Sequence, residues 1–195
     1  GALYYFPQIW TSDDTDGLER TKIQWGTSMC YPVSSMSCHV SACPNHQTQR
    51  TTPFATRGTV ASLGATGYEL DLTKLSEEEK AQVREQIENY KQIDELVLKG
   101  DLYRLSDPFQ SNYFCEMLVS KDKSKAYVVG ERFRGDPCDH DRVLKLRGLD
   151  EGKRYAIREL NVTASGAALM GVGLFCPRLP DCGSWVWHIE EIVKG

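Results

Sequence analysis

Three aspartates fall within four positions of this sequence, at Asp13, Asp14 and Asp16. They follow an aromatic, β-prone segment, residues 4–10, and precede a helix-like segment, residues 17–25. A strand that ends in polar residues and passes into a helix is the βα junction where barrel enzymes place their catalytic groups. Because like charges at this spacing repel, we expect at least one of the three to keep its proton near neutral pH, as a general acid must.

The same residues also suit the start of a helix. Asp and Thr are favoured N-cap residues, and acidic side chains suit the first turn. For Asp14 and Asp16 capping is the simpler interpretation, and tuning of the proton affinity of Asp13 is the alternative. Trp10 has two interpretations of equal weight: an apolar wall of a sugar site, or a core side chain.

The segment from Gln8 to Arg20, QIWTSDDTDGLER, resembles the α-galactosidases of glycoside hydrolase family 36. The resemblance extends over most of the chain, through PNHQT at 44–48, RTTP at 50–53, GYELDL at 67–72, LRGL at 146–149 and SGAALM at 165–170. In that family the first Asp of the Trp-x-Ser-Asp motif is the general acid/base, which implies this role for Asp13. The position directly after this Asp, which is Asp14 here, is often Asn in the family, so Asp14 is the weaker candidate.

The resemblance implies a retaining enzyme that removes terminal α-D-galactose from galactosides such as melibiose and raffinose-type oligosaccharides. The family carries a nucleophilic Asp and a sugar-binding loop upstream of this motif, and neither is in this sequence. We therefore expect the chain alone to be inactive and poorly soluble. An enzyme that transfers galactose to another acceptor is an open alternative. No cofactor or metal is expected, and the complete enzyme is expected to be a homo-oligomer.

Length and charge narrow the class of protein. The 195 residues are too few for a whole (β/α)8 barrel, which needs ~250, and the sequence starts without Met or a signal peptide, so we expect an internal-to-C-terminal piece of a longer enzyme. The net charge of −4 argues against nucleic acid or an anionic membrane as a partner. No apolar run reaches the ~20 residues of a membrane span. Seven irregularly spaced cysteines favour a reducing, cytoplasmic setting.

Periodicity predicts α/β structure in the first half, the C-terminal portion of a (β/α)8 barrel over residues 1–102. A helix with Glu19 and Arg20 facing outward should follow the acidic motif. A buried strand is expected over 36–42, a helix from Pro53 to about Leu63, and a strand over 68–72. Ser76 and Glu79 form a capping box before a long helix that ends at Gly100, with an apolar face that includes Val83, Ile87, Tyr90, Ile93 and Val97.

The second half, residues 103–195, is predicted to be an antiparallel β-sandwich domain. Short β-type runs at 113–119, 126–133, 143–146, 155–160 and 185–192 are separated by turn residues. Trp185 and Trp187 share one strand face, so they are either a core pair or a sugar-binding platform. The platform would make the chain a carbohydrate-binding module without catalysis, which is the alternative function.

Two further clusters combine Cys with His. Cys38, His39, Cys43 and His46 lack the usual spacing of a zinc site, and Cys38 and His39 should point to opposite strand faces. His46 is expected in a loop near the site. The run 138–141, CDHD, is most simply a hairpin turn, and Cys176 and Cys182 are expected to lie near each other in a loop.

Overall fold

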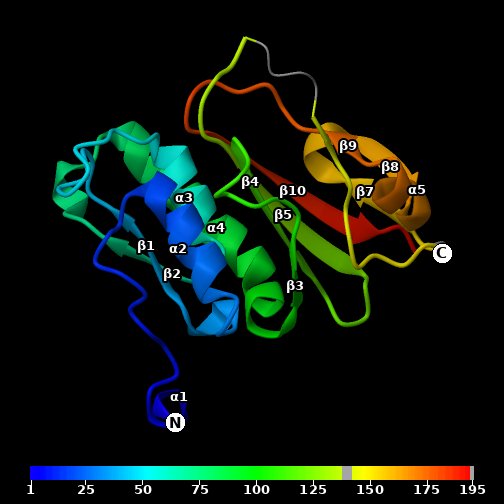
Figure 1. Cartoon of the computed structure of the whole chain (residues 1–195), viewed down its shortest axis with the longest axis horizontal. Coiled ribbons are helices and arrows are strands. Elements are labelled where there is room, and N and C mark those ends of the chain that lie inside the picture. The colour runs from blue at the N-terminus through cyan, green and yellow to red at the C-terminus, as the bar shows by residue number, and fades with distance from the viewer. Residues whose placement is uncertain (138–141, 194–195) are drawn as a thin grey trace. The chain divides into compact units, whose positions relative to one another are not determined.

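The computed structural model describes residues 1–137 and 142–193, which form two compact units, Gly1–Leu98 and Lys99–Gly195 (Figure 1). The run 138–141, with its predicted turn, lies outside the described residues. Among the described helices, none is both long and apolar enough to cross a bilayer.

A short parallel sheet lies at the centre of the first unit. Strand β1 (Ser37–Ser41) pairs in parallel with β2 (Ala65–Glu69). An isolated parallel bridge between Ile9 and Met36 places the segment before the aspartates beside β1. Each of these three segments is followed by a helix: α2 (Gly17–Thr27), α3 (Phe54–Ala61) and α4 (Glu77–Lys99). This repeated βα order is that of the end of a (β/α)8 barrel.

Local sequence sets the helix ends of this unit. Pro53 is the N-cap of α3, and α4 begins with the predicted capping box, in which Ser76 Oγ accepts from the Glu79 amide at 3.1 Å and Glu79 Oε2 accepts from the Ser76 amide at 2.9 Å. Two 3₁₀ turns, η1 (Val33–Ser35) and η2 (Leu72–Lys74), complete the unit. The hydroxyl of Tyr68 donates to Gln86 Oε1 at 2.9 Å and ties β2 to α4. Burial raises the pKa of Tyr68 to about 12.

Four details of the first unit differ from the sequence predictions. Tyr4 and Tyr5 lie in a one-turn helix, α1 (Ala2–Tyr5), with both rings exposed, and only Ile9 makes a strand-like pairing. Arg20 was expected to face outward and is 4% exposed, because its guanidinium donates to the carbonyl oxygens of Ser37 at 2.8 Å and Ser12 at 3.4 Å. The strand predicted over 68–72 is β2, which spans Ala65–Glu69. Ile87 of α4 is 40% exposed.

Antiparallel sheet makes up the second unit. Six strands pair in the order β3-β4-β5-β10-β7-β8, every neighbouring pair antiparallel. Their bounds are Asp101–Arg104, Tyr113–Val119, Lys125–Arg132, Gly183–Glu191, Arg154–Ile157 and Val162–Ser165. A second, two-stranded sheet pairs β6 (Val143–Leu144) with β9 (Leu174–Phe175). A turn, η3 (Arg158–Leu160), and a short helix, α5 (Gly166–Gly171), join the strands.

The core of the second unit lies between the two sheets, as in a sandwich. Alternate residues of β4, with Trp185 and Trp187 of β10, pack against Leu144 and Leu174 of the smaller sheet. The two tryptophans are 8% and 1% exposed, so they are a core pair and not a sugar platform. The short elements β3, β8, β9 and α5 were not predicted, because two to six residues carry too little periodicity to be recognised.

Candidate active site

A pocket of ≈ 440 Å³ opens where the parallel strands of the first unit end. Asp13 follows the Ile9 segment, Ser41 ends β1, and Glu69 ends β2 opposite Ser41 in the strand register. The carboxyl ends of parallel strands meet at one edge of the sheet, and barrel enzymes carry their chemistry at that edge. The residues that line the pocket are Trp10, Asp13, Thr15, Ser41, Ala42, Pro44, His46, Gln47 and Glu69.

Of the three clustered aspartates, Asp13 is the one whose carboxyl faces the pocket. Its side chain is exposed, and its Oδ1 accepts a hydrogen bond of 2.9 Å from the indole N–H of Trp10. Trp10 is 44% exposed, and it lines the pocket beside Asp13. Asp13 therefore combines access to a ligand with a donor that fixes its carboxyl group, which suits a group that exchanges protons with a substrate.

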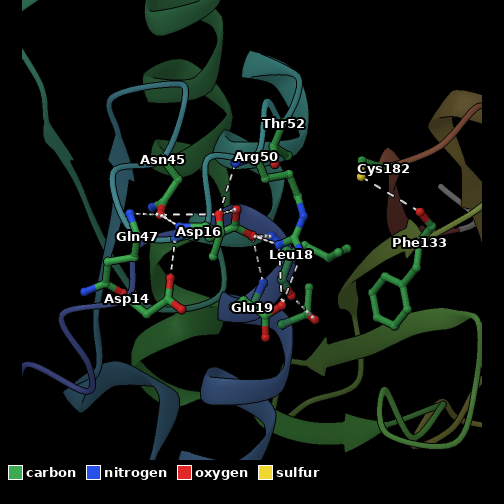
Figure 2. Close-up of polar contacts among 12 residues, drawn as sticks. Asp14, Asp16, Leu18, Glu19, Asn45, Gln47, Arg50, Thr52, Phe133 and Cys182 are labelled. Atoms are coloured by element: carbon green, nitrogen blue, oxygen red, sulfur yellow. Dashed lines mark hydrogen bonds and ion pairs between the residues drawn. The ribbon is translucent and has the colours of Figure 1, made fainter.

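Asp16 has a structural role. It is 2% exposed and is the N-cap of α2, where Oδ1 accepts from the backbone amides of Leu18 at 2.9 Å and Glu19 at 3.1 Å (Figure 2). Oδ2 accepts from the hydroxyl of Thr48 at 2.7 Å, and Oδ1 is paired with Arg50 at 2.5 Å. Asp16 thus caps its helix, as predicted, and also anchors the loop that follows β1.

Arg50 and Asp14 complete this anchor. Burial by itself would lower the pKa of the Arg50 guanidinium, but the hydrogen bond and charge of Asp16, with Glu19, outweigh it and raise that pKa above its usual value. Asp14 accepts from the backbone amide of Asp16 at 3.0 Å, so its carboxylate holds the turn that leads into α2 (Figure 2). Each of the three clustered carboxylates thus has different hydrogen-bond partners.

The loop between β1 and α3 forms the other wall of the pocket. Asn45, 4% exposed, accepts on its side-chain oxygen from the amides of Gln47 at 2.9 Å and Thr48 at 3.0 Å (Figure 2). Its amide nitrogen donates to Thr15 Oγ1 at 3.4 Å, on the segment that carries Asp13. The peptide bond from Cys43 to Pro44 is cis. Asn45 thereby joins the two loops that line the pocket and leaves His46 at its rim, as the sequence predicted.

Two side chains near Asp13 were not identified from sequence. His39 of β1 lies with its ring 4.8 Å from that of Trp10, and Glu69 lines the pocket at the end of β2. Glu69 was missed because the strand was expected to begin only at residue 68, so its end was placed past Glu69. In the sequence, His39 stands out only as a possible metal ligand. The alternation of side chains along β1 does not show which neighbour the His39 ring contacts.

Comparison with protein families assigns both halves of the chain. The Melibiase family matches residues 1–100, and the glycosyl hydrolase family 36 C-terminal domain matches residues 113–189. The chain belongs to glycosyl hydrolase family 36. Its recognition from the Trp-x-Ser-Asp segment and the later motifs is thereby confirmed, as is the fold of a barrel end followed by a β domain.

Relatives within family 36 match the chain along nearly its whole length. Alpha-galactosidase AgaA of Geobacillus stearothermophilus is 45% identical over 193 residues, which are 98% of this chain and 26% of that relative. The galactosidase domain of the α-galactosidase-sucrose kinase AgaSK superposes with a TM-score of 0.96 at 44% identity, covering 98% of this chain and 27% of that one. AgaA variants, at a TM-score of 0.95, have been solved with raffinose and with stachyose. The chain thus spans about a quarter of the length of these family 36 relatives.

Within the described ranges no three His, Cys, Asp or Glu side chains converge on a possible metal position. Cys38 is fully buried on one face of β1, whereas His39 is half-buried on the opposite face, as strand alternation predicted. Cys182 donates to the carbonyl oxygen of Phe133 at 3.8 Å (Figure 2), and Cys176 and Cys182 form no disulfide with each other.

Proposed function

We propose that this chain is the C-terminal part of a retaining α-galactosidase, with barrel residues 1–102 and sandwich residues 103–195, and that Asp13 is its general acid/base. The enzyme hydrolyses terminal α-D-galactose from galactosides such as melibiose and raffinose-type oligosaccharides. The observation that carries the proposal is the position of Asp13, exposed at the mouth of a pocket where three parallel segments end. Asp14 is the runner-up, and Trp10 the proposed sugar-contacting neighbour.

The reaction proceeds in two steps that both use Asp13. In the first, the protonated carboxyl gives its proton to the glycosidic oxygen while the bond from that oxygen to the sugar's anomeric carbon breaks and a nucleophilic carboxylate bonds to the same carbon. In the second, the Asp13 carboxylate takes a proton from water, whose oxygen displaces the enzyme carboxylate and releases galactose. The acid/base thus regains its proton at the end of each cycle.

Burial and bonding favour Asp13 over its neighbours for this role. Asp16 is 2% exposed and ion-paired, and Asp14 is engaged by the amide of Asp16. A group that must reach a glycosidic oxygen within hydrogen-bond distance needs an accessible carboxyl on the pocket side. The structures of the relative AgaA with raffinose and stachyose support the substrate class.

We further propose that the 195 residues alone are inactive. A retaining mechanism needs two carboxyl groups only ~5 Å apart, on either side of the scissile bond. In this proposal the nucleophile belongs to the part of the enzyme that precedes the chain. Homo-oligomeric assembly of the complete enzyme and a cytoplasmic location stay predictions.

The test replaces Asp13 by Asn in the complete enzyme. General acid catalysis contributes typically about 10²–10⁴-fold, so kcat/KM for melibiose should fall by about that factor, while an aryl galactoside with an acidic phenol leaving group should lose far less in the same step. Azide, which attacks the galactosyl enzyme without needing a base, should raise the turnover of an Asp13→Gly variant on the aryl substrate. The matched control is Asp14→Asn. Full melibiose activity in Asp13→Asn, or a larger loss in Asp14→Asn, would refute the assignment.

A further inference from the structure

The carboxyl of Asp13 is held by a donor from its own segment. The indole N–H of Trp10 donates to Asp13 Oδ1 at 2.9 Å, three residues away along the chain. A donor at this distance makes a hydrogen bond of ordinary length and limits the rotation of the side chain. Trp10 is nevertheless 44% exposed, so something other than burial must hold its ring in place.

His39 supports the ring of Trp10. The two rings meet edge to face, with centroids 4.8 Å apart and planes at 63°. The imidazole also lies close to Gly67, its strand partner in β2, where an added Cβ would lie 3.0 Å from His39 Cδ2 and 3.1 Å from Nε2. Gly67 therefore provides room for the imidazole. Because it is close to both β2 and Trp10, the His39 ring limits the positions open to the indole.

Glu69 faces the remaining nitrogen of His39. Its Oε2 lies 3.8 Å from Nδ1, a buried atom that has no hydrogen-bond partner among the described residues. Glu69 ends β2 two residues after Gly67 and lines the same pocket as Asp13. The three parallel segments thus contribute four side chains to a row: Glu69 from β2, His39 from β1, and Trp10 and Asp13 from the first segment.

We propose that Glu69, His39 and Trp10 are positioning residues for the acid/base Asp13, which act through the indole N–H. The inference rests on the proposed role of Asp13. It gives the indole N–H of Trp10 the function of holding the carboxyl that transfers the proton, in addition to any contact of the ring face with the sugar. Glu69 orients His39, His39 fixes the indole, and the indole holds the carboxyl that must face a glycosidic oxygen and then a water in successive steps.

The first test is Trp10→Phe in the complete enzyme, because this change keeps an apolar ring and removes the N–H. We expect kcat/KM for melibiose to fall by about 10- to 100-fold, since a small misplacement of a catalytic group can cost about 10²-fold. The aryl galactoside, which needs little acid assistance, should lose less than about threefold. Trp25→Phe, in α2 of the same unit, is the matched control and should change none of these values.

His39→Ala and Glu69→Gln extend the test along the row. Each should reproduce the leaving-group dependence of Trp10→Phe, His39→Ala by about 10-fold and Glu69→Gln by less, because each acts through the next residue. Equal losses on both substrates with a raised KM would mean that Trp10 serves only as a sugar wall, and would overturn the proposal. If Asp13→Asn itself leaves melibiose activity intact, the proposed function fails. If Asp13→Asn is impaired and Trp10→Phe is not, only the proposal that Glu69, His39 and Trp10 position Asp13 fails.

A second measurement follows the hydrogen bond without catalysis. In the complete enzyme labelled with ¹⁵N at its indole groups, the signal of Trp10 is identified by its loss in Trp10→Phe. We expect the Trp10 signal to move in Asp13→Asn and in His39→Ala and to stay in place in Trp25→Phe. An unmoved signal in Asp13→Asn would refute the hydrogen bond between Trp10 and Asp13. An unmoved signal in His39→Ala would show that His39 does not position the indole.

Discussion

The two units bury carboxylates in opposite ways. In the first unit, Asp16 is 2% exposed and is surrounded by two backbone amides, the Thr48 hydroxyl and the Arg50 guanidinium. In the second, Glu116 of β4 is 1% exposed, and its Oε1 has no hydrogen-bond partner among the described residues. A buried charge is stable only when it is paired. Glu116 lacks a set of partners like that of Asp16, and burial favours the neutral form of its carboxyl.

This difference follows from what each unit must position. The first unit joins two loops around a polar pocket, and buried polar groups fix these loops relative to each other. The second unit is held by an apolar core between two sheets, which needs close packing more than charge. Stability in the first unit should therefore depend on ion pairs, and in the second on side-chain shape.

Removal of the Asp16 charge should have the largest effect. Asp16→Asn keeps an oxygen that can cap α2 but leaves Arg50 without its closest partner. Breaking a buried pair costs about 3–5 kcal/mol, and the lower end applies here because the Arg50 side chain is 32% exposed. We expect a loss of unfolding free energy of about 3 kcal/mol, measured by urea unfolding with tryptophan fluorescence. Asp14→Asn, whose amide oxygen can still accept from the Asp16 amide, should lose less than about 1 kcal/mol. Equal losses in the two variants would show that the Arg50 pair is not the source of stability.

Gly130→Ala tests the close packing of the second unit. A Cβ at Gly130 would lie 2.1 Å from Trp185 Cζ2, so the indole would have to leave its place in the core. Overpacking of this kind costs typically about 1–3 kcal/mol, and we expect the upper end because the displaced group is a rigid ring. The loss should appear in the melting temperature, together with a changed near-UV signal from Trp185. Gly152→Ala, where the nearest atom is 3.5 Å away, is the control, and a loss there as large as at Gly130 would contradict the packing argument.

How much the sequence could predict also differs between the units. The capping box before α4, the cap at Asp16 and the strands β4, β5 and β10 were predictable, because each depends on residues close in sequence or on a long periodic run. The burial of Arg20 was not, since its acceptors are carbonyl oxygens of Ser12 and Ser37, on two other segments. The motif indicated Asp13 as the candidate, but the contact of His39 with Trp10 depends on the pairing of separate strands, which the sequence does not show.

Glu116→Gln should stabilise the second unit at neutral pH. Burial raises the pKa of Glu116 to about 8, against the opposing charge of Arg104, while the unfolded chain ionises near the usual value of 4.5. Between these values the folded state binds more protons than the unfolded state, so the parent loses stability as pH rises from about 4.5 to 8. The Gln variant has no such proton. Its stability relative to the parent should therefore be on the order of 3 kcal/mol more favourable at pH 7 than at pH 4. A constant difference between the two proteins across this range would refute the pKa shift.

Gly26→Ala should have the smallest effect and sharpen the meaning of the first prediction. Gly26 lies in α2, ten residues after Asp16, and an added Cβ would meet no atom within 4 Å. Replacement of an exposed helical Gly by Ala gains about 0.5–1 kcal/mol, because the unfolded chain loses conformational freedom. Ten residues of helix separate the two sites by ~15 Å, so the gain should add to the loss of Asp16→Asn within about 0.5 kcal/mol. If Asp16 were only a helix cap, Asp16→Asn would cost little, because Asn is as good an N-cap, and the double variant would be about 0.5–1 kcal/mol more stable than the parent. We expect it to stay about 2 kcal/mol below the parent, because the pair with Arg50 holds a loop and not only a helix.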